Sequence, residues 1–193
     1  MILSVFNLIF KFNKWRVYPN CPAEAHNCIM VAAPHTSNWD FVYSMVALKK
    51  LGLNTRFTIK KEFNKPLIGS WIRSLGALWI DRSPRKGSTE RPSMTEVMFD
   101  LFNKSEEKMA VLVTPEGTRS KVTKWKTGFY YTALEAKVPI CLADMDYKNK
   151  ITGVVQCFMP SGNIEQDMKI IMDFYRGRNG KFPENFALDQ RYA

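Results

Sequence analysis

The stretch Cys28-Ile29-Met30-Val31-Ala32-Ala33-Pro34-His35-Thr36-Ser37-Asn38-Trp39-Asp40 predicts a strand, a loop and the start of a helix. Its first six residues form an uninterrupted apolar run, which is typical of a strand buried on both faces. The apolar residues from Phe41 to Leu51 recur at helical spacing, and Gly52 is a suitable residue to end a helix. One of the two histidines of the chain therefore lies between a buried strand and a helix, five positions before an aspartate.

His35 and Asp40 can meet in only one arrangement. Residues five apart on an ideal helix are rotated by about 140° from each other, so they do not share a face. We therefore expect His35 in the loop and Asp40 in the first helical turn, with Ser37 or Asn38 as the N-cap. Asp40 would then bond one ring nitrogen of His35 and leave the other free to accept a proton, as in a general-base pair. The alternative is a capped loop with a structural His–Asp bond, and the local pattern does not decide between the two.

The rest of the chain alternates between predicted strands and predicted helices. Strands are expected at about 28–33, 55–59, 77–80, 109–113, from 138, and 151–158, and helices at about 39–51, 66–75, 93–103, 128–136 and 164–176. This alternation predicts an α/β fold with a largely parallel central sheet flanked by helices. Residues 177–193 are interrupted by Gly and Pro and predict a loosely packed tail.

Several polar residues directly follow predicted strands, and this shared position makes them candidates for one site. In open α/β sheets, ligands bind beyond the carboxyl ends of the strands. Gly117 allows close backbone approach, and Thr118 and Arg119 are donors suited to a phosphate. Taken singly, each arginine is better explained by an ion pair with a neighbouring carboxylate. The candidate residues are His35, Asp40, Lys60, Lys61, Arg82, Glu116, Gly117, Thr118 and Arg119.

The net charge of +10 is unevenly distributed. Residues 1–89 hold thirteen Lys/Arg and four Asp/Glu, whereas residues 90–193 hold fifteen and fourteen. The basic surplus thus lies in the half that contains His35, which favours anionic partners such as phosphate groups or an anionic bilayer. A solvated basic surface explains the charge equally well. Nucleic acid is not an expected partner, because no nucleic-acid-binding motif is present.

Residues 1–17 predict a short amphipathic N-terminal helix, followed by a single domain over 18–193. Most of residues 2–16 are apolar, with Ser4, Asn7, Lys11 and Lys14 on one narrow stripe. The segment is shorter than the roughly 20 apolar residues needed to span a bilayer. It either lies in a membrane interface or packs on its own domain, and periodicity does not distinguish these.

The four cysteines indicate three buried thiols and neither a metal site nor a disulfide framework. Cys28, Cys141 and Cys157 lie in apolar runs, and no C-x-x-C pair occurs. Cys21, His26 and Cys28 are close in sequence, but a fourth ligand is not apparent, so we expect no metal. The expected absence of disulfides favours a reducing compartment.

Four short motifs resemble those of the glycerolipid acyltransferase family, which includes bacterial 1-acylglycerol-3-phosphate acyltransferase. His35 and Asp40 match its histidine-x4-aspartate motif, and Gly76-Ala77-Leu78-Trp79-Ile80-Asp81-Arg82 matches its second motif. Glu116-Gly117-Thr118-Arg119 and Val138-Pro139-Ile140 match the third and fourth. The four occur in the family order over about residues 28–142.

The resemblance implies a reaction and a set of roles. His35 would act as general base on a lysolipid hydroxyl, which would attack an acyl thioester, and Asp40 would orient His35. Arg82 and Glu116–Arg119 would hold the anionic head of the acceptor, and Lys60 or Lys61 would lie near the developing oxyanion. Acyl-coenzyme A or acyl-acyl carrier protein would be the co-substrate, with no further cofactor. The expected partners are a lysophosphatidic acid-like lysolipid and an anionic membrane surface, on the cytoplasmic inner face of the cell membrane.

Three alternatives to this reading remain open. The first is an acyltransferase whose acceptor is a lysolipid without phosphate, such as a lyso-aminolipid. A hydrolase using the same His–Asp pair would take water as its acceptor. A basic binding module without catalytic activity is the third.

Overall fold

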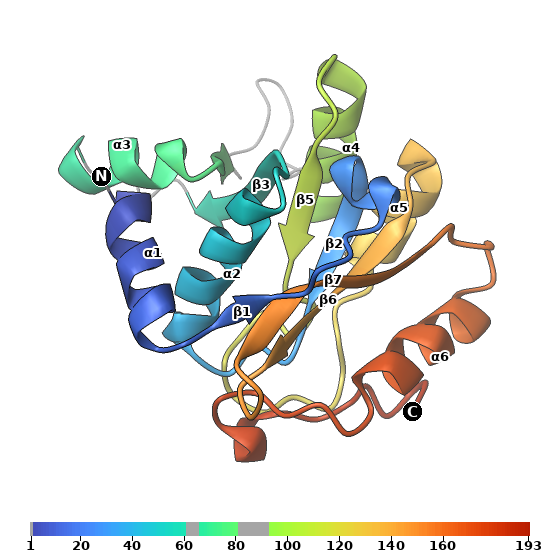
Figure 1. The fold of residues 1–193 in the computed structure, drawn as a ribbon. Helices are drawn as coiled ribbons and strands as arrows, with labels where there is room; N and C mark the ends of the chain where they lie inside the picture. Colours follow the sequence, from blue (N-terminus) through green and yellow to red (C-terminus); the bar gives the residue numbers. More distant parts are fainter. Residues whose placement is uncertain (1, 61–65, 81–92) are drawn as a thin grey trace.

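The computed structural model describes residues 2–60, 66–80 and 93–193, which have an α/β fold (Figure 1). The elements, in chain order, are α1 (Ile2–Phe12), β1 (Arg16–Val17), η1 (Ala23–His26), β2 (Cys28–Ala32), α2 (Asn38–Lys50), β3 (Thr55–Lys60), α3 (Pro66–Ser74), β4 (Ala77–Ile80), α4 (Met94–Lys104), β5 (Ala110–Val113), α5 (Gly128–Ala136), β6 (Ile140–Asp146), β7 (Ile151–Phe158), α6 (Ile164–Tyr175) and η3 (Pro183–Asn185).

The strands of the described residues form one sheet in the order β1-β7-β6-β2-β5-β3-β4. Every neighbouring pair is parallel except β6 and β7, which are antiparallel. The predicted α/β fold with a largely parallel sheet is therefore confirmed. Strand β5 lies between β2 and β3, and because these three strands are parallel, their carboxyl ends lie at the same edge of the sheet.

The central strand β2 is apolar throughout because both of its faces are covered. Ile29 and Val31 belong to the largest core cluster, which includes buried residues of α4, α5 and α6. Cys28 and Met30 alternate with them and pack in a second cluster with Leu48 of α2. A strand buried on both faces shows no polar alternation, which explains the unbroken apolar run in the sequence.

Helix α1 is shorter than the predicted helix over 2–16, and one side of it packs on the domain. It ends at Phe12, and Lys14 has a positive φ of 60°, which takes the chain out of the helix and into β1. Phe10 is buried against Trp15 and Tyr43 of the third core cluster. None of the helices in the described ranges has the length and apolar character needed to cross a bilayer.

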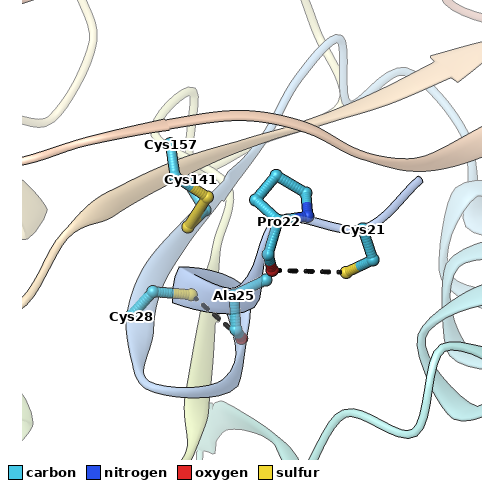
Figure 2. The surroundings of a disulfide bond; sticks show 6 residues. All are labelled: Cys21, Pro22, Ala25, Cys28, Cys141 and Cys157. Atoms are coloured by element: carbon cyan, nitrogen blue, oxygen red, sulfur yellow. Dashed lines mark hydrogen bonds between the residues drawn. A yellow bond between two sulfur atoms is a disulfide. The ribbon is translucent and has the colours of Figure 1, made fainter.

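The prediction that Cys141 and Cys157 are thiols was wrong. These two residues are register partners on the antiparallel strands β6 and β7, and they form a disulfide (Figure 2). Their Cα atoms are 4.0 Å apart, although sixteen positions separate them in sequence. Cys28 is a buried free thiol that donates to the carbonyl of Ala25, as Figure 2 also shows. The expectation of a reducing compartment rested on the absence of disulfides, so it loses that support.

The prediction of a loosely packed tail over 177–193 was also wrong. Asp189 is fully buried, and its carboxylate accepts the backbone N–H of Trp125 at 2.9 Å. The same carboxylate pairs with Arg191, whose guanidinium also donates to the carbonyl of Trp125 at 2.7 Å. The indole N–H of Trp125 donates to the carbonyl of Ala187. The tail thus packs against the loop that leads into α5 and is joined to it by hydrogen bonds. No local sequence pattern reveals these bonds.

We predict that Asp189→Ala destabilises the protein by about 3 kcal/mol, because it leaves a buried N–H without an acceptor and Arg191 without its partner. Urea unfolding followed by tryptophan fluorescence measures the change. Glu184→Ala removes an exposed carboxylate of the same tail and should change stability by less than about 0.5 kcal/mol. Equal effects of the two substitutions would show that the tail contacts contribute nothing specific.

Candidate active site

The loop before α2 has the geometry that the sequence predicted. Helix α2 begins at Asn38, Ser37 is its N-cap, and Asp40 is in its first turn. Asp40 Oδ2 accepts the backbone N–H groups of Thr36 and Ser37, each at 2.9 Å. Asp40 therefore closes a capping box, and its side chain turns back toward the loop that holds His35.

His35 lies outside the helix and against this carboxylate. Its Nδ1 is 3.2 Å from Asp40 Oδ2, and the two side chains are 19% and 8% exposed. Among the described residues, Nε2 of His35 has no hydrogen-bond partner. The arrangement thus has an oriented imidazole with one nitrogen available for a proton, which is the geometry that general-base catalysis requires.

Sequence reasoning missed Tyr147, whose hydroxyl donates to Asp40 Oδ1 at 2.5 Å. Tyr147 lies directly after β6, 107 positions from Asp40. Burial, and then the hydrogen bond and negative charge of Asp40, raise the pKa of the Tyr147 phenol well above its ordinary value, so it remains a donor. Nothing in the sequence around Tyr147 signals this contact.

Glu116 holds the His35 loop from the neighbouring strand. Its Oε1 accepts the backbone N–H of His35 at 2.9 Å, which links the loop after β5 to the loop after β2. The side chain is 6% exposed, and Oε2 has no hydrogen-bond partner among the described residues. Burial raises the pKa of this carboxyl from 4.5 to about 7, although the bond from His35 acts in the opposite direction. The observed contact is to the protein backbone, and the sequence-based role of Glu116 in binding a head group stays a prediction.

A cleft of about 660 Å³ lies beside His35. Its volume is within the range typical of small-molecule sites, roughly 300–1,000 Å³. Apolar side chains from α2, β3, α3, α4, β5 and α5 form much of its lining, and the remainder is lined by residues of the loops, of β3 and of the start of α2. The apolar lining is Phe41, Phe57, Ile59, Ile72, Met98, Leu112, Val113 and Phe129, and the polar lining includes His35, Asn38, Thr114, Arg119 and Lys126.

Among the described residues, the loop after β5 supplies the two cations that line this cleft. Gly117 has a φ of +68°, a backbone conformation that residues with a side chain rarely adopt, and the end of the Lys126 side chain packs directly against it. Arg119 and Lys126 both line the cleft, whereas the exposed Thr118 accepts the backbone N–H of Ser120. Lys126 was not among the predicted site residues, although the basic loop that follows Arg119 in the sequence was a signal for it.

The remaining candidates are only partly tested. Lys60 is the last residue of β3, at the same sheet edge as His35 and Glu116, and its backbone alone is described. Lys61 and Arg82 lie outside the described residues. Within the described part of the chain, no group of three or more His, Cys, Asp or Glu side chains is arranged to hold a metal ion.

The C-terminal tail reaches the first motif loop. The backbone N–H of Phe182 donates to Thr36 Oγ1 at 3.2 Å. A Cβ on Gly180 would lie 2.5 Å from the same oxygen, so the tail packs directly on the loop. The loop that carries His35 is therefore held by α2, by Glu116 and by the tail.

Comparison with known proteins decides the family. The Acyltransferase family model matches residues 15–142, which is more than half of the chain. The chain belongs to the acyltransferase family. The matched segment contains His35, Asp40, Glu116 and Arg119, whereas Tyr147 and the C-terminal tail lie beyond it.

Two known acyltransferases are similar to this chain. A 1-acyl-sn-glycerol-3-phosphate acyltransferase from Streptococcus pneumoniae (strain ATCC BAA-255 / R6) is 33% identical over 120 residues. The match covers 62% of this chain and 41% of that protein, so it spans about two fifths of the relative's length. The crystal structure of the 1-acyl-sn-glycerophosphate acyltransferase PlsC from Thermotoga maritima has the same fold, with a TM-score of 0.58 and 18% identity over 93% of this chain and 80% of that one.

We predict that Glu116 makes stability depend on pH. The folded protein keeps the proton on Glu116 up to about pH 7, whereas an unfolded carboxyl releases it near 4.5. Because the folded state binds more protons between these values, the free energy of unfolding should fall as the pH rises through this window.

Thermal unfolding of the wild-type protein and Glu116→Gln from pH 4.5 to 8 measures this effect. Gln keeps an oxygen that accepts the His35 N–H but does not titrate. The wild-type protein should therefore lose stability relative to Glu116→Gln as the pH rises. A pH-independent difference would mean that Glu116 does not titrate in this range.

Proposed function

We propose that this protein transfers a fatty acyl group from an acyl thioester to the hydroxyl of a lysophospholipid resembling lysophosphatidic acid. The observation that carries the proposal is the His35–Asp40 pair beside a cleft with an apolar lining and two cations. Membership of the acyltransferase family supports the reaction class. Acyl-coenzyme A or acyl-acyl carrier protein is the proposed donor, and no further cofactor is needed.

In the proposed mechanism His35 acts as the general base. Nε2 takes the proton of the acceptor hydroxyl as the oxygen attacks the thioester carbonyl. The C–S bond then breaks, the thiolate leaves with the proton from the imidazolium, and the new ester forms. Asp40 faces Nδ1, so it selects the tautomer with a free Nε2 and stabilises the imidazolium.

The cleft lining supports an amphiphilic substrate. Its aromatic and aliphatic side chains favour an acyl chain through the hydrophobic effect. Arg119 and Lys126 favour an anionic head, because a charge-assisted hydrogen bond to phosphate is worth about 1.5–3 kcal/mol. These cations are the reason to prefer a phosphate-bearing acceptor over a lyso-aminolipid. Lys60 or Lys61 near the oxyanion, and Arg82 with Glu116–Arg119 at the head group, are the further roles that the family motifs suggest.

We predict that His35→Ala lowers the transfer rate by roughly 10²–10⁴-fold, the usual contribution of a general base. Release of thiol from acyl-coenzyme A, with and without lysophosphatidic acid, measures the rate. His26→Ala is the matched control, because His26 is the other histidine of the chain and is exposed in η1.

The same assay separates the alternatives. Acceptor-dependent thiol release supports acyl transfer, whereas release without acceptor would indicate a hydrolase. No release of thiol, with or without the acceptor, would favour a binding module. Mass spectrometry of the products from a panel of lysophospholipids and lyso-aminolipids then identifies the acceptor.

The proposal includes peripheral attachment to an anionic membrane, on the cytoplasmic inner face of the cell membrane. While Phe10 of α1 is buried, Val5, Leu8 and Phe12 are 52%, 68% and 86% exposed. Lys11 lies in the last turn of the same helix. An apolar helix face beside basic residues is suited to the interface of an anionic bilayer, so α1 combines packing on the domain with an outward apolar face.

We predict that Leu8→Glu/Phe12→Glu weakens binding to vesicles of phosphatidylglycerol and phosphatidylcholine by at least tenfold, because it adds charge to the face that would be inserted. Sedimentation with the vesicles measures the binding. Met159→Glu is the control, because Met159 is a 57% exposed apolar residue that follows β7, away from α1. The assignment of this surface would be contradicted if both variants lost vesicle binding equally, or if neither variant lost it.

A further inference from the structure

Tyr147 is held in a fixed position by two other aromatic side chains. It follows β6 in the turn to β7, where Asn149 binds the carboxylate of Asp146 through its backbone and its side chain. The ring of Trp15 meets Tyr147 edge-on at 5.0 Å, and that of Tyr43 meets it at 6.2 Å. The contacts on the ring leave the hydroxyl directed at Asp40.

The bond from Tyr147 completes the donor set of Asp40. Oδ2 of Asp40 accepts two backbone N–H groups, those of Thr36 and Ser37, and faces Nδ1 of His35. Oδ1 has the Tyr147 hydroxyl as its one donor within the described residues. Without this hydroxyl, one carboxylate oxygen of a largely buried residue would lose its partner, and the orientation of the carboxylate would be fixed by its Oδ2 contacts alone.

We infer that Tyr147 is a positioning residue for the reaction: its hydroxyl fixes the Asp40 carboxylate in the orientation that keeps the proton of His35 on Nδ1. The residue acts through Asp40 and is not one of the residues that line the cleft. It also lies beyond the segment that the family model matches, which ends at residue 142. The kinetic part of this inference rests on the proposed acyl transfer, whereas the part on the state of His35 does not.

The side-chain packing makes a clean substitution possible. Tyr147→Phe removes the hydroxyl and keeps the ring against the stacked pair of Trp15 and Tyr43. Tyr43→Phe is the matched control, because it removes a hydroxyl from the same aromatic cluster without removing a bond to Asp40. Both variants should keep the thermal midpoint of the wild-type protein to within a few degrees, since a single hydrogen bond contributes about 1 kcal/mol.

The first measurement is steady-state kinetics with acyl-coenzyme A and lysophosphatidic acid. Tyr147→Phe should lower kcat by roughly 10–100-fold, the cost often seen when an outer hydrogen-bond partner of a functional side chain is removed. The KM values should stay unchanged, because Tyr147 does not contact the cleft. Tyr43→Phe should leave both parameters near those of the wild-type protein.

The second measurement is the ¹⁵N NMR spectrum of the imidazole rings, at a pH at which His35 is neutral. The chain has two histidines, so His26→Ala assigns the signals of His35 directly. In the wild-type protein the shifts should indicate a proton on Nδ1, and in Tyr147→Phe they should indicate a mixture of the two tautomers. A purely structural tyrosine would not change this ratio in a folded protein.

Three outcomes would overturn the inference: an unchanged tautomer ratio in Tyr147→Phe, an unchanged kcat, or a loss of kcat matched by Tyr43→Phe. The NMR result does not need an active substrate. If the wild-type protein transfers no acyl group to any lysolipid but the tautomer ratio responds as expected, the proposed function fails while the positioning of His35 by Tyr147 stands.

Discussion

The carboxylate of Asp40 is the point on which the site depends. It caps the first turn of α2, fixes the two backbone amides that follow His35, and faces the imidazole itself. A single side chain thus joins the start of a helix to the loop that precedes it. Moving Asp40 by one position would move it to another side of the helix and remove all of these contacts together.

The sheet supplies the second constraint. Because β2 and β5 are adjacent and parallel, their following loops meet at one edge, and Glu116 bonds to the backbone of His35 across that gap. This bond is made by a buried carboxyl, which burial shifts toward its neutral form. The loop after β5 therefore has two functions: Glu116 supports the His35 loop from below the surface, and Arg119 lines the open cleft.

The segments outside the family motifs complete the same loop. Tyr147 reaches Asp40 from the β6–β7 turn, and the tail reaches Thr36 through the backbone of Phe182. Both contacts join residues more than a hundred positions apart. The site therefore depends on folding of the whole described chain, including elements that carry no recognisable motif.

The sequence by itself determined the order of the longer strands and helices, because apolar periodicity and end signals act over a few residues, but it missed the two-residue strand β1. It also determined that His35 had to precede the helix that carries Asp40, since helix geometry leaves no other way for the two to meet. Only the tertiary structure decided the contacts that long-range packing creates. The Cys141–Cys157 disulfide depends on strand register. The hydrogen bond from Trp125 to Asp189 depends on the path of the tail, and the bond from Tyr147 to Asp40 depends on the position of a turn that is distant in sequence. Each joins groups whose separation along the chain says nothing about their separation in space, so local propensity had no means to reveal them.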